Sequence, residues 1–187
     1  VEVNPRDSAA YYNWGLALFL LDRHAEACEK YAKTAELQPR FAGAYYSWGV
    51  ALEKLDRHSQ ACEKYAKATE LNPQYAGIYY SWGVALTRLN RHADACEKYA
   101  KTAQLDPRSG AAYCDWGRAL DRLGRYAEAC EKYAQAIQIN PRDASALSSW
   151  GYALEKLGRY AEACEKYAQA VQMNPRFTWV YCQWGRA

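Results

Sequence analysis

The feature that most constrains this chain is a period of 34 residues that runs through all 187 of its residues. Six prolines recur at this interval from Pro5 to Pro175, and the dipeptide Trp-Gly recurs in the same step from Trp14 onward. The pentapeptide Cys-Glu-Lys-Tyr-Ala begins at Cys28 and returns in the same register, which no insertion interrupts. A period of this length indicates stacked copies of one supersecondary unit.

Each unit contains two predicted helices of about 13 residues. In the first unit, Tyr11, Trp14, Leu18 and Leu21 are spaced three and four apart and form one helical face. A second helical pattern starts near Ala27 and ends before the next proline, whose ring disfavours helix in the residue before it. A single hairpin of this size cannot bury its apolar faces, so neighbouring units must stack.

The predicted turn between the two helices has a common backbone requirement. It falls at Asp22, Asp56, Asn90, Gly124 and Gly158. Gly, Asn and Asp are the residues that best tolerate a left-handed conformation, which a tight turn between helices requires. The turn residues therefore support a helical hairpin in each repeat.

These features resemble the tetratricopeptide repeat: the period, a small residue after a bulky one in the first helix, Ala at the start of the second, Tyr four residues later and a terminal Pro. The resemblance covers the whole chain. It implies an all-α fold, a right-handed α-solenoid of antiparallel helix pairs, with the first helices lining a concave face. As one array, residues 1–187 divide into the end of a preceding repeat (1–7), full repeats 8–41, 42–75, 76–109, 110–143 and 144–177, and a partial repeat 178–187.

The chain departs from the family pattern at two positions. The bulkiest ring of the first helix, Trp14, stands directly before Gly15, and the second helix carries Cys28 where the family often has a branched aliphatic residue. We hypothesise an exchange of volume, in which a larger side chain at one core position faces a smaller one at another. This hypothesis requires contact between a Trp ring and a Cys side chain.

The cysteines and histidines are predicted to be structural, and we expect neither a metal nor a cofactor. Stacked helices lie about 8–10 Å apart, beyond disulfide reach for equivalent cysteines, and the total of seven is odd. His24 and Cys28 are spaced for two metal ligands, but a structural zinc needs four. Tyr126 replaces the histidine in the fourth repeat, which indicates an aromatic packing position. Seven unpaired cysteines favour a reducing compartment, so a cytoplasmic location is expected.

Charge and motif content exclude several classes of function. The net charge is only +3 and no basic face is concentrated enough to predict nucleic-acid binding. No apolar run approaches the ~18 residues of a membrane span. Pairs such as Glu26–Lys30 and Glu29–Lys33 have the i,i+4 spacing of a solvated helix face. No nucleophile with a base and an acid, and no phosphate loop, can be found, so the chain is not expected to be an enzyme.

Partner binding is predicted on the first helices, at positions two before, two after and six after each Trp of the Trp-Gly pairs. The predicted residues are Tyr12, Leu16, Tyr46, Val50, Lys54, Tyr80, Val84, Arg88, Arg118, Arg122, Tyr152 and Lys156. The early repeats offer Tyr and aliphatic side chains, and the later ones are polar and basic. An alternative is that the tyrosines only pack between adjacent first helices. The family's Lys/Asn clamp for a terminal carboxylate would correspond to Tyr12 and Leu16, which lack that chemistry.

Three functions remain open from the sequence. The first is an interaction scaffold that binds a peptide or protein partner in the groove, as a segment of a longer array. The second is a self-assembling protein that stacks head to tail into a filament or oligomer, because neither end shows a polar capping helix and the repeats are nearly identical. The third is a regulatory module of a larger protein.

Overall fold

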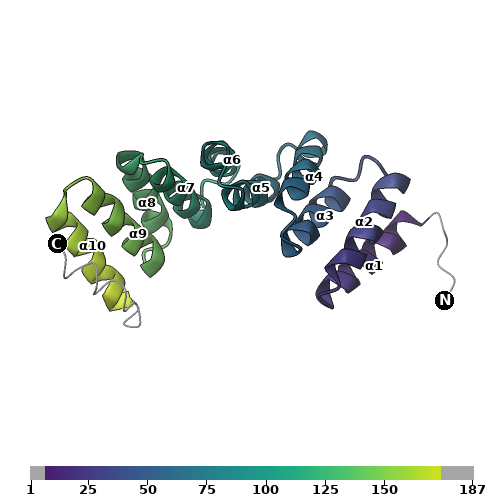
Figure 1. The fold of residues 1–187 in the computed structure, drawn as a ribbon, viewed down its shortest axis with the longest axis horizontal. Coiled ribbons are helices and arrows are strands. Elements are labelled where there is room, and N and C mark those ends of the chain that lie inside the picture. The colour runs from purple at the N-terminus through teal and green to yellow at the C-terminus, as the bar shows by residue number, and fades with distance from the viewer. Residues whose placement is uncertain (1–6, 174–187) are drawn as a thin grey trace. The chain divides into compact units, whose positions relative to one another are not determined.

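The computed structural model describes residues 7–173, which form ten α-helices and no strand (Figure 1). The chain divides into two compact units, Val1–Arg91 and His92–Ala187. Residues 1–6 and 174–187 lie outside the described residues, and with them all but the last residue of the predicted repeat end 1–7, the last four residues of the predicted repeat 144–177 and the whole partial repeat 178–187. No helix among those described is both long and apolar enough to cross a membrane.

The N-terminal unit contains two helical hairpins and one further helix. Its elements are α1 (Ser8–Leu20), α2 (His24–Leu37), α3 (Ala42–Lys54), α4 (His58–Leu71) and α5 (Ala76–Arg88). Helices α1 and α2 pack together, as do α3 and α4, while α3 also packs on α2 and α5 on α4. Each pair is thus buried against its neighbour in sequence, as a stack of repeats requires.

The C-terminal unit follows the same plan. Its elements are α6 (His92–Leu105), α7 (Gly110–Arg122), α8 (Tyr126–Ile139), α9 (Ala144–Lys156) and α10 (Tyr160–Met173). The hairpins are α7 with α8 and α9 with α10, and α6 packs on α7 as α8 packs on α9 (Figure 1). First helices have 13 residues and second helices 14, close to the predicted length.

The predicted left-handed turns are confirmed. The φ angles are +57° at Asp22, +56° at Asp56, +58° at Asn90 and +73° at both Gly124 and Gly158. In the second repeat the turn closes when the amide of Arg57 donates to the carbonyl of Leu52 at 2.9 Å. Asp and Asn serve here because they tolerate this backbone conformation better than other side chains with a Cβ.

A buried tyrosine from each second helix explains the recurrent Trp-Gly pair. Tyr65 and Tyr133 are fully buried, and their rings lie against the backbone of the first helix of the same hairpin. A Cβ added to Gly49 would stand 2.5 Å from the Cε1 of Tyr65, and one added to Gly117 would stand 2.6 Å from that of Tyr133. Only glycine lets the helix and the ring approach this closely.

The side chains of Trp48 and Trp82 pack between repeats. Trp48 of α3 and Cys28 of α2 line the same crevice, and the Lys64 ammonium lies 4.1 Å from the centre of the Trp48 ring. The pKa of the Cys62 thiol is raised, mainly by burial. The Trp82 indole lies against that sulfur and partly opposes the rise. The contact that the volume-exchange hypothesis requires is therefore present, between a Trp and the Cys of the preceding repeat.

Glu26 lies on an exposed helix face as expected, but its direct ion pair is not with Lys30, four residues later. Glu26 accepts two hydrogen bonds from the Arg23 guanidinium, at 2.6 and 2.5 Å, while the Lys30 ammonium lies 4.3 Å from the centre of the Trp14 ring. The planar fork of arginine matches both carboxylate oxygens, and the indole face attracts the lysine. Similarly, Lys33 pairs with Glu36 and not with Glu29.

Candidate partner-binding surface

The first helices of the N-terminal unit form a pocket between α3 and α5. Its volume is about 410 Å³, and four of the predicted residues, Val50, Lys54, Val84 and Arg88, line it. Glu53 also lines it, beside Asp56 and His58 at the hairpin turn. The two valines give the pocket apolar sides and the charged residues give it a polar rim.

An equivalent pocket lies between α7 and α9 of the C-terminal unit. Its volume is about 470 Å³, and it is lined by Arg118, Asp121, Arg122, Ser149 and Tyr152. Three of these, Arg118, Arg122 and Tyr152, were predicted. Arg118 and Tyr152 stand 68 residues, or two repeats, after Val50 and Val84. The same place in the fold is therefore apolar in one unit and basic and aromatic in the other.

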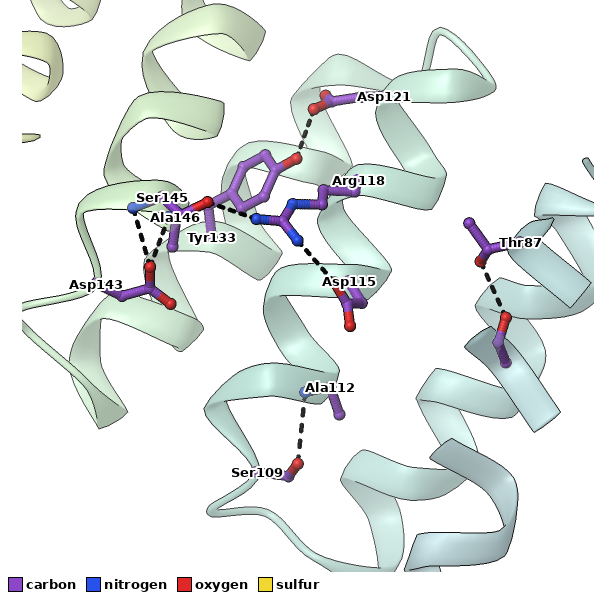
Figure 2. A network of polar contacts seen from close by, with 11 residues as sticks. Thr87, Ser109, Ala112, Asp115, Arg118, Asp121, Tyr133, Asp143, Ser145 and Ala146 are labelled. Carbon is purple, nitrogen blue, oxygen red and sulfur yellow. Dashed lines mark hydrogen bonds and ion pairs between the residues drawn. The ribbon is translucent and has the colours of Figure 1, made fainter. Parts of the chain in front are cut away.

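Hydrogen bonds hold Arg118 in a defined position at the C-terminal pocket (Figure 2). Its Nη1 donates to Asp115 Oδ1 at 3.0 Å and its Nη2 donates to Ser145 Oγ at 2.6 Å. Ser145 is fixed in turn, because its amide donates to Asp143 Oδ1, which caps α9. The Arg118 guanidinium is therefore fixed by residues of both α7 and α9.

Each pocket has a carboxylate that the sequence prediction did not assign to the site. The Tyr65 hydroxyl donates to Glu53, and the Tyr133 hydroxyl donates to Asp121 Oδ2 at 2.5 Å (Figure 2). Burial raises the pKa of Asp121 to about 6, although the Tyr133 hydrogen bond and the nearby Arg122 oppose this. Burial also raises the pKa of Glu53. The constant spacing of 12 residues between acid and tyrosine is the signal that could have revealed these pairs.

The predicted tyrosine column packs between first helices. Tyr12 contacts the Phe41 ring edge-on at 4.9 Å, and its hydroxyl is hydrogen bonded to Ser47 Oγ at 3.1 Å. Tyr46 is bonded to the equivalent serine, Ser81, at 3.5 Å. These rings are half-buried, so their first role is to join one first helix to the next.

Tyr46 also lines a smaller pocket with Gly43 and Tyr75, about 250 Å³ in volume. Tyr80 stands half-buried at the same register of α5. These two rings thus keep some accessible surface beside their packing contacts.

The remaining predicted residues lie outside the two main pockets. Leu16 is exposed on α1. Lys156 follows the C-terminal pocket on α9, with its ammonium 5.2 Å from the centre of the Tyr152 ring. The structure therefore brings seven of the twelve predicted residues into two pockets and leaves the other five outside them.

The histidine position behaves as an aromatic packing site. The His24 ring lies 4.9 Å from the Phe19 ring, and Tyr126, at the equivalent position, meets Tyr152 edge-on at 6.4 Å. Across residues 7–173, no group of three or more His, Cys, Asp or Glu side chains is arranged to hold a metal ion. The cysteines described are free thiols, and burial raises the pKa of Cys130 to about 11, which keeps it protonated and unreactive.

Family comparisons match three stretches of the chain. Three family models, each described as a tetratricopeptide repeat, match residues 9–40, 42–75 and 114–176. A search of curated proteins found no match.

Several solved structures share the fold. A crystal structure of YrrB, described as a TPR protein with an unusual peptide-binding site, is 22% identical, with a TM-score of 0.86 over 96% of this chain and 93% of that one. MamA from Desulfovibrio magneticus is 17% identical, with a TM-score of 0.86 over 95% and 99%. PilF of Pseudomonas aeruginosa is 22% identical, with a TM-score of 0.76 over 90% and 78%. At these identities the likeness concerns the fold alone, and it confirms the predicted all-α solenoid of helix pairs.

Proposed function

Because the chain belongs to the tetratricopeptide-repeat family, we propose that it is an interaction scaffold that binds a peptide or protein partner on the face formed by its first helices. The family generally mediates protein–protein interaction and is typically non-enzymatic. YrrB, which shares the fold, is described as having a peptide-binding site.

The observation that carries this proposal is the pair of equivalent pockets. Both lie between consecutive first helices, and both are lined by basic side chains and a carboxylate. Ligand sites in proteins are concave, with apolar lining and a few fixed polar groups that set orientation. The valines give the N-terminal pocket its apolar lining. Arg118, fixed by hydrogen bonds, gives the C-terminal pocket a polar group that can set orientation.

The difference between the pockets predicts selectivity. Val50 and Val84 suit an aliphatic side chain of the partner, whereas Arg118, Arg122 and Tyr152 suit a polar or acidic one. A partner that satisfies one pocket chemistry does not satisfy the other, so the array distinguishes between sequences and does not bind extended chains at random.

The proposal is tested by selecting peptides from a displayed random library against the full chain and measuring their affinity by fluorescence polarisation. Lys54→Glu, at the rim of the N-terminal pocket, should weaken selected peptides that use this pocket at least five-fold, on the order of 1 kcal/mol. Lys67→Glu on α4 is the matched control, since Lys67 is also exposed but lines none of the pockets described above. Equal losses in both variants, or no selected peptide, would contradict the proposal.

Self-assembly is the second candidate, and one observation favours it. Trp14 and Leu20 of α1 and Leu21 directly after it are exposed, Leu20 to 82%, whereas Trp48, the equivalent of Trp14, packs in the crevice beside Cys28. We propose that a helix of a second copy covers this surface of α1. Light scattering at increasing concentration should then show growth that Leu21→Lys abolishes, and a strict monomer at high concentration would exclude this candidate.

A further inference from the structure

The arginine that precedes the second helix of a repeat is paired in several repeats but not in the second one. Arg23, Arg125 and Arg159 each donate two hydrogen bonds to a glutamate three residues later, at 2.5 to 2.7 Å. The second repeat has Gln60 in place of that acid. The Arg57 guanidinium accordingly makes no hydrogen bond or ion pair with any residue in the part of the chain that the structure describes.

Arg57 lines the crevice between the second helices α2 and α4, which has a volume of about 480 Å³. The apolar lining of this crevice comes from Ala25 and Ala32 of α2 and from Trp48 and Leu52 of α3. An apolar lining that carries a few charged groups is typical of a ligand site. None of these residues lines the pocket between the first helices α3 and α5, so the crevice is a separate surface of the N-terminal unit.

The other charged side chains of the crevice leave the Arg57 guanidinium open. Glu29 and Glu63 also line the crevice, but neither lies within ion-pair distance of Arg57, and Glu29 lies 3.9 Å from Lys30. A glutamate recurs at this position in every full repeat, where the paired arginines nevertheless bind the acid three residues after them. Lys64 lies over the Trp48 ring. The charges of the crevice therefore balance, and the open guanidinium decides which ligand it fits.

We propose that the crevice between α2 and α4 binds an acidic side chain of a partner protein, whose carboxylate accepts from Arg57 the two hydrogen bonds that an internal glutamate accepts in other repeats. Arginine presents parallel N–H groups that match both oxygens of a carboxylate, so the open guanidinium selects this group over a neutral amide. An aliphatic side chain next to the acid packs against Ala32 and Leu52. The crevice is then a second interaction surface, and its binding does not depend on the pockets between the first helices.

The test uses nuclear magnetic resonance on the full chain, with acetyl-Leu-Glu-amide as the probe. The glutamate of the probe supplies the carboxylate, and its leucine supplies an aliphatic neighbour for the apolar lining. We expect the probe to shift the side-chain signals of Arg57 and the indole signal of Trp48. The neutral match, acetyl-Leu-Gln-amide, should bind roughly five-fold more weakly, because an amide cannot accept both hydrogen bonds of the guanidinium.

The variant Gln60→Glu supplies the missing acid from within the chain. It gives the second repeat the same arginine and glutamate that pair in the first repeat, so the fold should be kept, and circular dichroism checks this. Arg57 should then pair internally, and the affinity for the probe should decrease roughly five-fold. Gln60→Ala is the matched control, since it removes the same amide without adding a carboxylate and should change the affinity by less than about two-fold.

The reverse substitution tests the same reasoning in the C-terminal unit. Glu128→Gln removes the carboxylate that Arg125 binds, at the position equivalent to Gln60. Trp116 stands at the position of Trp48 there, with the Lys132 ammonium 4.3 Å from the centre of its ring. We expect this variant to gain a site for the probe, which is seen as a shift of the Trp116 indole signal that the wild type does not show.

The proposal is overturned if the glutamine probe binds as well as the glutamate probe, if Gln60→Glu binds the probe like the wild type, or if Glu128→Gln gains no site. It is also overturned if light scattering shows self-association that Gln60→Glu abolishes, because the occupant is then a second copy of this chain. Lys54→Glu should leave the affinity for the probe unchanged. A failure at the crevice therefore leaves peptide binding by the first helices untouched, and the loss of one can be told apart from the loss of the other.

Discussion

The substitution Gly117→Ala tests the role of the Trp-Gly pair in the packing of each hairpin. The added methyl carbon would stand 2.6 Å from Cε1 and 2.9 Å from Cδ1 of the Tyr133 ring, where ordinary contact begins near 3.4 Å. The ring has no room to retreat, because it is fully buried and its hydroxyl is bonded to Asp121 at 2.5 Å. Either the ring or the helix backbone must therefore move by most of an ångström.

The expected loss follows from two opposing effects. Overpacking of a well-packed core costs about 1–3 kcal/mol, and the fixed ring places this site at the upper end. Alanine is favoured over glycine inside a helix by roughly 1 kcal/mol, which offsets part of the cost. We expect a net loss of about 2 kcal/mol in the free energy of unfolding, equivalent to a decrease of about 4–8 °C in melting temperature for a chain of this size.

Thermal and guanidinium unfolding are followed by circular dichroism, for Gly117→Ala and for two comparison variants. Gly110→Ala is the matched control, since its added carbon would meet Ile139 Cγ2 at 3.4 Å, an ordinary contact. Tyr133→Leu removes the ring, so in that background Gly117→Ala should be neutral or stabilising. Wild-type stability in Gly117→Ala, or the same loss with and without the ring, would refute the packing argument.

Three further predictions concern charge, backbone and aromatic contacts. Burial raises the pKa of Asp121 from 3.8 to about 6, so this carboxyl holds its proton more tightly in the folded state than in the unfolded chain. Its contribution to stability is therefore complete below pH ~4 and is lost as the pH rises through about 6. Urea unfolding should show that the free energy of unfolding decreases more between pH 4 and 7.5 in the wild type than in Asp121→Asn, by about 1–2 kcal/mol because solvent screens this partly exposed carboxyl, and equal decreases would contradict the prediction. At the left-handed turns, Gly158→Ala should cost about 1–2 kcal/mol by chemical denaturation although its added carbon would touch nothing, while Asp56→Gly should not destabilise; the reverse order would show that the turn angle is not what matters. Lys132→Met should cost about 0.5–1 kcal/mol, since the ammonium lies 4.3 Å from the centre of the Trp116 ring, and the cost should vanish in a Trp116→Leu background if the contact is its source.

The elements that the sequence predicted well depend on neighbours along the chain. The turn at Asp56 has a positive φ because the six residues from Leu52 to Arg57 close the hairpin, and glycine stands at the same position in the last two repeats described. The aromatic packing position at His24 could likewise be recognised, because Tyr126 replaces it in the same register. Because the repeat shows each position several times, positions that keep the same kind of side chain for packing can be told apart from variable ones.

Ion pairing could not be predicted from spacing alone. Glu26 has lysine four residues later, at the favourable distance on a helix, yet it pairs with Arg23. The competitor for Lys30 is Trp14, which belongs to the other helix of the hairpin and is far from it in sequence. Only the folded hairpin brings that ring into reach.

What the sequence determined by itself is the repeat, its two helices, the turn conformation and the register of the first-helix columns, because each depends on residues within one 34-residue unit. The tertiary structure alone decided which of those columns meet. Val50 and Val84, or Arg118 and Tyr152, share a pocket because consecutive first helices lie side by side once the second helix between them is folded back. It also placed a tyrosine hydroxyl against each pocket carboxylate, and burial there, which no sequence pattern measures, raises the pKa of Asp121 to about 6.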